Sequence, residues 1–232
     1  MKTAAALVAL AGVAAIATAQ ASVSGSTVLA NWDTFGNSGN SADLPVSGTA
    51  TGVIATVWTR GPGLGTSSAG NSFSSNNWDE SQQGAASEDY FSVTLTADAL
   101  YDLDVDTLYI GTRSSNTGPA NLGIFSSVDG FSTALDTFFQ SGTSFTNSGL
   151  NIDLTIAAGD SVEFRIIEIG NDQADGSGST AGTGTFRLTD YVAGGTFFDI
   201  QFEGASTLIP TPGAVALAGV AGLAAARRRR NG

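Results

Sequence analysis

The chain has 232 residues, with 9 Lys and Arg against 21 Asp and Glu, and it contains neither His nor Cys. The absence of both residues excludes disulfides, thiolate chemistry, the Ser-His-Asp triad and zinc sites built from His or Cys. The whole-chain net charge is −12, but residues 20–207 hold all 21 acidic residues and only four arginines, which excludes binding of this part to nucleic acid or anionic lipid by charge attraction. Carboxylate chemistry and oxygen-ligated cations remain.

The first residues have the pattern of a secretory signal peptide. Lys2 supplies a positive start, residues 4–17 are all apolar or Gly, and Ala17-Thr18-Ala19 is a small-residue cleavage site, with Ala19-Gln20-Ala21 as the alternative. We therefore expect residues 1–19 to be a signal peptide and residues 20–207 to be exported. All 21 acidic residues lie in this body, and its only cations are four arginines.

The body has a β pattern throughout. Runs rich in Val, Ile, Thr, Phe and Tyr alternate with Gly/Ser/Asn loops, and no helical period is sustained. This predicts an all-β fold, a single two-sheet sandwich of jelly-roll type. The two Gly-rich stretches 61–77 and 170–184 are predicted to be surface loops, and Phe131–Leu135 a helical turn. The expected strands are Ser22–Trp32, Gly52–Arg60, Tyr90–Thr96, Tyr101–Thr112, Leu122–Val128, Leu150–Ala157, Val162–Ile169, Thr185–Tyr191 and Thr196–Phe202.

Candidate saccharide contacts come from one aromatic and two basic residues. A sugar ring stacks on an exposed aromatic face beside polar groups that hold its hydroxyls. Trp78 is the candidate ring because it lies in a polar segment, although a tryptophan that anchors the loop in the core fits the same pattern. Arg60 and Arg113 are the candidate polar groups, since cations are rare in this body, and pairing with carboxylates is the alternative role for both.

Acidic residues at two places suggest Ca²⁺, which takes six to eight oxygen ligands. Asp172 and Asp175 lie in the second Gly-rich loop and are the candidate calcium ligands. Asp102, Asp104 and Asp106 would share one face of a strand, where a solvated surface is the favoured interpretation. If either group binds Ca²⁺, the ion should raise the melting temperature of the body relative to EDTA.

The last segment, residues 208–232, has three parts. Pro210-Thr211-Pro212 is followed by 14 apolar or Gly residues at 213–226 and then by Arg227, Arg228, Arg229 and Arg230. A helix over the apolar run would be about 21 Å long at 1.5 Å per residue, short of the roughly 30 Å hydrocarbon core. The four arginines would remain on the cytoplasmic side of the membrane.

This tail resembles the PEP-CTERM sorting signal of bacterial envelope proteins, with Thr211 in place of the usual acidic residue between the prolines. The resemblance implies export, transient anchoring in the inner membrane and cleavage near the proline motif by an exosortase-type enzyme. It also implies release to the cell surface or the extracellular matrix.

The body resembles ectodomains that often precede such tails. The resemblance rests on Arg60–Leu64, Phe73–Trp78, Arg113–Pro119, Ser126–Phe131 and Thr185–Leu188, followed by 194–203. Those ectodomains are sandwiches similar in form to carbohydrate-binding and discoidin-like modules.

These observations favour a non-enzymatic protein of the cell surface or matrix that binds glycans. A structural or adhesive matrix protein without a small ligand is one alternative, and a secreted carboxylate-dependent glycoside hydrolase is another. The adjacent pairs Asp79-Glu80 and Glu88-Asp89 do not suit the hydrolase, because neighbouring residues on a strand point to opposite faces and cannot flank one bond.

Overall fold

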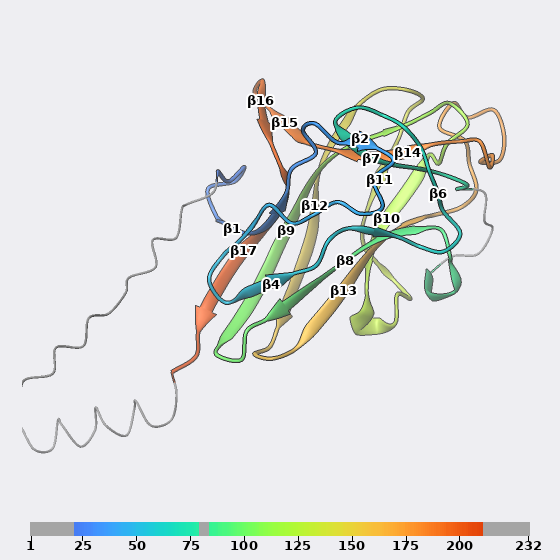
Figure 1. The fold of residues 1–232 in the computed structure, drawn as a ribbon. Coiled ribbons are helices and arrows are strands. Elements are labelled where there is room, and N and C mark those ends of the chain that lie inside the picture. Colours follow the sequence, from blue (N-terminus) through green and yellow to red (C-terminus); the bar gives the residue numbers. More distant parts are fainter. Residues whose placement is uncertain (1–20, 79–83, 211–232) are drawn as a thin grey trace, which may run out of the picture.

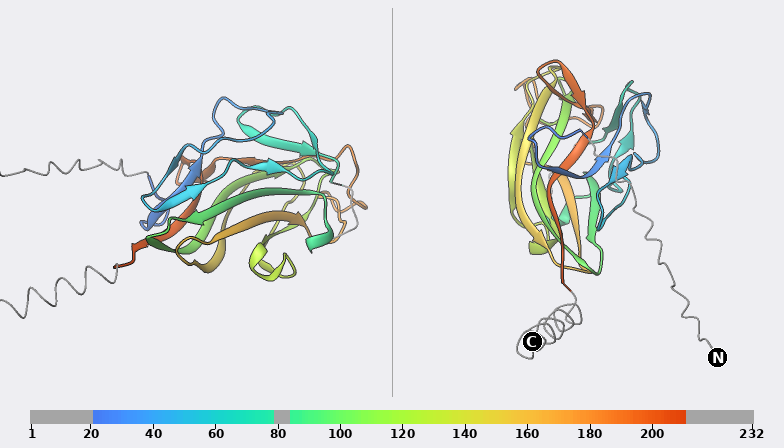
Figure 2. Two further views of the ribbon diagram at one scale, coloured as in Figure 1. Left: turned by 60° about the horizontal axis from the view of Figure 1, so that its bottom comes forward. Right: turned by 90° about the vertical axis from the view of Figure 1, so that its left-hand side faces the viewer.

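Residues 21–78 and 84–210, which the computed structural model describes, form an all-β protein with two packed sheets (Figures 1 and 2). The expected signal peptide, Asp79 and Glu80, and the tail from Thr211 onward lie outside the described residues. No helix among the described residues is both long and apolar enough to cross a membrane.

The larger sheet is organised around β9 (Tyr101–Ser114), its longest strand. One edge of β9 pairs with β12 (Thr146–Ile156). Its other edge pairs first with β17 (Ile200–Leu208) and then, near its end, with β14 (Phe186–Thr189). The sheet continues through β1 (Thr27–Trp32) and β3 (Gly48–Thr49) beyond β17, and through β7 (Ser72–Asn76), β2 (Ser38–Gly39) and β6 (Gly65–Thr66) beyond β14.

The second sheet covers the inner face of the first. Its order is β11 (Ala134–Phe139), β10 (Asn121–Ser126), β13 (Ser161–Glu168), β8 (Tyr90–Ala97) and β4 (Val53–Ala55), with β5 (Thr59–Arg60) also paired to β8. A separate hairpin of β15 (Tyr191–Ala193) and β16 (Thr196–Phe198) extends from the larger sheet (Figure 1). Two 3₁₀ turns complete the described structure, η1 (Gly84–Ala86) and η2 (Ser127–Asp129).

The core lies between the sheets and follows from the alternation of the strands. Phe91, Val93 and Leu95 of β8 are buried while the residues between them are half-buried, as the sequence predicted. All three tryptophans are fully buried and contribute large apolar surfaces to this core.

Some predicted elements differ from the structure. The predicted helical turn at 131–135 is wrong: the 3₁₀ turn comes earlier, at η2, and Ala134 already begins β11. Gly130 and Phe131 both have positive φ, which interrupts the chain between the two elements. The first Gly-rich stretch is not all loop, because it contains β6 and β7 and buries Phe73.

Candidate functional site

Two arginines lie side by side on the outer face of the larger sheet. Arg187 of β14 is directly opposite Arg113 of β9 on one side and opposite Ser74 of β7 on the other. Phe186 and Leu188, the neighbours of Arg187 along β14, are buried. Because side chains alternate along a strand, Arg187 must point away from the core. Strand register therefore places the two guanidinium groups together.

The two positive charges share one aromatic ring. The guanidinium carbon of Arg113 lies 5.0 Å from the ring centroid of Phe145, and that of Arg187 lies 5.2 Å from it. Burial lowers the pKa of Arg187, and the charge of Arg113 lowers it further. Neither arginine forms an ion pair or donates a hydrogen bond to a residue that the structure describes. Like charges opposite one another destabilise a sheet, so this pair is an unfavourable arrangement for the isolated protein.

A pocket of about 250 Å³ opens beside the pair. Arg113 and Arg187 line it together with five serines, two threonines and one alanine, and no carboxylate contributes to its wall. Phe145 is 61% exposed next to the two guanidinium groups. The pocket therefore offers hydroxyls and positive charge to a ligand, and the ring of Phe145, which is not part of its wall, lies beside the two arginines that are.

The outer face continues from this pocket with two tyrosines. Tyr109 lies on the same face of β9 as Arg113, and its ring meets that of Tyr191 edge to face at 5.2 Å. The Tyr109 ring can lie in this position because residue 149 is a glycine, whereas a Cβ there would lie 2.9 Å from the ring. We call the set Tyr109, Arg113, Phe145, Arg187 and Tyr191 the aromatic–basic face.

Trp78, the predicted stacking residue, is buried and forms part of the core. Its exposed fraction is 0%, and its ring meets those of Phe91 and Phe186 edge to face at 5.2 and 5.3 Å. A sugar cannot reach either ring face in this arrangement. The prediction of a ligand contact at Trp78 is therefore corrected, and the alternative of a core anchor describes the residue.

The guanidinium group of Arg60 has a structural role and is not free to bind a ligand. Its guanidinium donates hydrogen bonds to the backbone carbonyls of Gly39, Ser41 and Ser74, and it lies 3.8 Å from the ring centroid of Phe73. Burial lowers its pKa to about 10. Backbone carbonyls take the place of the carboxylates that the sequence suggested as its partners. Of the two predicted basic contacts, Arg113 alone faces an open pocket.

A second pocket lies at the end of the smaller sheet. Its volume is about 480 Å³, and it is lined by the 58% exposed ring of Phe139 together with Asn121, Thr137 and Asp172. It combines an aromatic ring with polar groups but contains no cation. It is the weaker candidate because its one charged residue, Asp172, is an acceptor only and no cation lines the wall beside the ring.

Asp172 and Asp175, the predicted calcium ligands, belong to no cluster of three carboxylates among the described residues. The Ser177 side chain and then its backbone N–H, which donates to the Asp175 carboxylate at 2.8 Å, lower the pKa of Asp175. Asp172 accepts hydrogen bonds through its backbone carbonyl from Ala120 N–H and the Thr180 hydroxyl. Calcium binding at these two residues remains a prediction.

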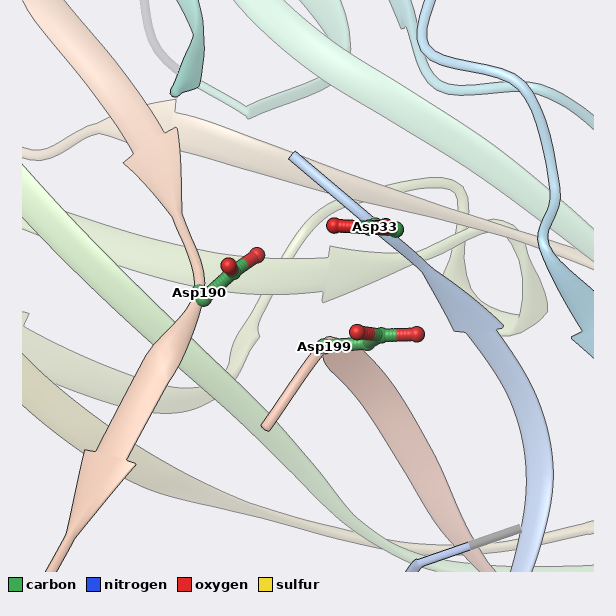
Figure 3. Close-up of side chains that lie close together, drawn as sticks. All are labelled: Asp33, Asp190 and Asp199. Carbon is green, nitrogen blue, oxygen red and sulfur yellow. The ribbon is translucent and has the colours of Figure 1, made fainter. Parts of the chain in front are cut away.

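One acidic cluster does form, from three other aspartates (Figure 3). Carboxylate oxygens of Asp33, Asp190 and Asp199 lie within 4.8 Å of one another. Burial and repulsion from the neighbouring carboxylates raise the pKa of Asp190 and of Asp199, against the opposing effect of hydrogen bonds from Thr34 and Asn31. These oxygens are of the type that Ca²⁺ prefers, and they also have protein donors of their own.

Sequence reasoning missed most of these groupings for one reason. The groupings join residues from strands and strand ends that are far apart in the chain: Arg187, Phe145, Tyr109 and the three clustered aspartates. Their proximity depends on how the strands are aligned with one another in the sheet. One clue existed, because only four cations occur in the body and two of them are Arg113 and Arg187.

No protein-family model matches the sequence, and no curated protein matches it. Solved structures similar to this chain are carbohydrate-binding modules of family 29. One is 14% identical, with 79% of this chain and 90% of the module covered and a TM-score of 0.36. A mutant module complexed with cellulohexaose is 15% identical, with 79% and 95% covered and a TM-score of 0.34. At these values the similarity assigns neither a ligand nor binding residues to this chain.

Proposed function

We propose that this protein is an exported, non-enzymatic saccharide-binding protein whose ligand occupies the aromatic–basic face. The observation that carries the proposal is the exposed ring of Phe145 beside Arg113 and Arg187 at the edge of a hydroxyl-lined pocket. Aromatic faces match the apolar faces of sugar rings, and a few polar groups fix the orientation of the ligand. Tyr109 and Tyr191 extend the surface for further sugar residues.

The proposed location rests on the two ends of the sequence. The signal peptide would direct the chain through the secretion machinery, and the PEP-CTERM-like tail would hold it briefly in the inner membrane. An exosortase-type enzyme would then cut near Pro210–Pro212 and release the body to the surface or matrix. Mass spectrometry of the native protein should find a C-terminus near this motif, and an intact Arg230 would contradict the proposal.

The two pockets lined by described residues support the non-enzymatic part of the proposal. A glycosidase places two carboxylates about 5 to 9.5 Å apart around the bond to be cut. The pocket at Arg113 has no carboxylate in its wall, and the pocket at Phe139 has one, Asp172. Asp89 is buried while its neighbour Glu88 is exposed, so this pair does not face one cleft.

A glycan array probed with the full chain tests the proposal, with and without Ca²⁺. Wild type should bind at least one polysaccharide, and Phe145→Ala should lose about tenfold or more in affinity, as is typical of removing a stacking ring. Ile54→Ala is the matched control, because Ile54 is an exposed apolar residue of the other sheet. Absence of binding to every saccharide would instead favour a structural or adhesive matrix protein.

A further inference from the structure

We propose that Arg113 and Arg187 form an anion subsite, so that the ligand of this face is an acidic saccharide carrying carboxylate or sulfate groups. The inference rests on the proposed saccharide-binding function and names its ligand class. It begins from the placement of charge. Two of the four cations in an acidic body lie opposite each other on neighbouring strands, although 21 carboxylates are available in the chain.

The other two arginines show what a structural arginine looks like in this protein. Arg60 donates to several backbone carbonyls. Arg165 forms an ion pair with Glu163 at 2.7 Å and lies about 4 Å from the ring centroids of Tyr90 and Phe131. Arg113 and Arg187 have the aromatic contact but no hydrogen-bond or ion-pair partner within the described chain. Their donors remain available to a ligand.

The chemistry of these donors selects anions. A guanidinium carries five N–H donors in a planar fork that matches carboxylates and other oxyanions in a bidentate manner. An anion bound between the two guanidinium groups would offset the repulsion between their positive charges. An oxyanion is thus the ligand that converts the unfavourable pair into a favourable site.

The rest of the pocket suits a sugar more than a free inorganic ion. The side-chain hydroxyls of Ser67, Ser68 and Thr143 line it and make no hydrogen bond to another described residue. Its volume of about 250 Å³ is below the roughly 300–1,000 Å³ of typical ligand pockets. It would therefore accept a single charged sugar residue while the remainder of a chain lies along the tyrosines.

The anionic surroundings should confine polyanion binding to this site. Within residues 20–207, four arginines stand against 21 carboxylates, so this body repels acidic polymers at long range, and the other two arginines, Arg60 and Arg165, already have protein partners. Removing the pair should therefore abolish binding to acidic saccharides instead of spreading it over weaker sites. Loss of binding when the pair is removed would distinguish a specific binding site from non-specific attraction to a charged surface.

The test is isothermal titration of the full chain, carrying Gln in place of Arg227–Arg230 so that the tail does not bind polyanions, with two matched pairs of polymers at 0.05 and 0.5 M NaCl. Polygalacturonate is compared with its methyl ester, and dextran sulfate with dextran, so that the members of a pair differ in their acidic groups. We expect at least one acidic polymer to bind about tenfold or more tighter than its neutral partner, and high salt to reduce this difference. The pair in which the difference appears identifies carboxylate or sulfate as the anion.

Three variants complete the experiment. Arg113→Met with Arg187→Met should remove binding to the acidic polymer, and Arg187→Lys should weaken it because the charge remains while the fork is lost. Arg165→Met, which removes a ring-stacked arginine from the other sheet, should leave binding unchanged. The Arg187→Lys variant also covers the case in which the double variant fails to fold.

The outcomes distinguish the two proposals. Equal affinity for the acidic and neutral polymers, lost on Phe145→Ala, would overturn the anion subsite and leave saccharide binding intact. Acidic binding that survives the double arginine variant would also overturn the subsite. Absence of binding to all four polymers and to the glycan array would overturn both proposals.

Discussion

Arg60 and the pair Arg113–Arg187 both combine a guanidinium group with a phenylalanine ring, but the Arg60 side chain is hydrogen-bonded to the protein and the side chains of the pair are not hydrogen-bonded to any described residue. In both regions a guanidinium lies over a phenylalanine ring, Phe73 in the first and Phe145 in the second. Arg60 fastens a turn to the sheet through backbone carbonyls, and its ring partner is fully buried. The pair at Phe145 has an exposed ring and no hydrogen-bond acceptor within residues 21–78 and 84–210.

The difference separates stability from binding. A half-buried cation whose donors are filled by backbone groups contributes to folding, since removing it leaves those carbonyls unpaired. A cation opposite another cation, with its donors unfilled, contributes little or opposes folding. We therefore expect substitutions in the first region to change stability and substitutions in the second to change ligand affinity.

The largest expected effect concerns the buried aromatic cluster beneath both regions. Trp78→Ala should lower the free energy of unfolding by about 3–5 kcal/mol, because it leaves a cavity among Phe91 and Phe186. Phe145→Ala should change it by less than about 0.5 kcal/mol, because that ring is on the surface. Urea unfolding of both variants checks this contrast, and similar values for the two would contradict it.

Arg60→Met should have the second largest effect and lower the free energy of unfolding by about 2–3 kcal/mol. The substitution keeps much of the contact with Phe73 but removes the guanidinium donor from the carbonyls of Gly39, Ser41 and Ser74, of which Ser74 keeps the Ser67 backbone N–H. Thermal and chemical unfolding measure the loss. Saccharide affinity of the remaining folded protein should be unchanged, and a binding defect at full stability would reverse the roles assigned to the two regions.

Arg187→Met should have a small effect on stability of the opposite sign. Loss of one of two opposed charges should leave the protein unchanged or up to about 0.5 kcal/mol more stable. Differential scanning calorimetry of this variant beside Arg60→Met makes the comparison direct. A loss of more than about 2 kcal/mol would mean that Arg187 has a structural partner.

The cluster of Asp33, Asp190 and Asp199 places like charges together, as the two arginines do, and its small effect on stability should depend on pH. The pKa of Asp199 is raised in the folded state by burial and by Asp33 and Asp190. A raised carboxyl pKa favours the protonated folded form, so stability falls as pH rises through the folded-state pKa and this penalty is absent below the ordinary value of 3.8. Asp199→Asn should therefore stabilise the protein at pH 7 by a few tenths to about 1 kcal/mol, and the gain should vanish in acid.

Melting curves of Asp199→Asn across pH 3–8 check this dependence, with the exposed Asp106→Asn as the control. A gain that is the same at pH 3 and pH 7 would rule out repulsion as its cause. Millimolar Ca²⁺ forms a second arm of the experiment. Stabilisation by Ca²⁺ that Asp199→Asn removes would assign the ion to this cluster, whereas loss on Asp172→Asn with Asp175→Asn would assign it to the loop predicted from the sequence.

Much of the fold could be predicted because local alternation determines which residues are buried. The strand at Tyr90–Thr96 and its inward residues Phe91, Val93 and Leu95 follow from period-two alternation. The all-β class follows in the same way, while the jelly-roll type of sandwich remains a prediction. Short strands such as β6 and β7 could not be recognised, because Ser and Gly carry no periodic signal and only Phe73 marks a buried position.

The candidate site could be predicted only in part. Arg113 was identified because cations are rare, but its partner Arg187 depends on the register between β9 and β14, which is set by tertiary packing. Trp78 was misassigned because its polar neighbours suggested a surface loop, whereas its ring fills the core beside Phe186. Local composition describes the neighbours of a residue in sequence but not in space.

The central claim is that Arg113 and Arg187 contact the ligand while Arg60 and Arg165 do not. Arginine side-chain NMR tests it most directly, because the body contains only these four arginines. On titration with an acidic oligosaccharide, the Nε–Hε signals of Arg113 and Arg187 should shift together and those of Arg60 and Arg165 should remain in place. Binding that shifts Arg60 or Arg165, or that leaves Arg113 and Arg187 unmoved, would contradict the account.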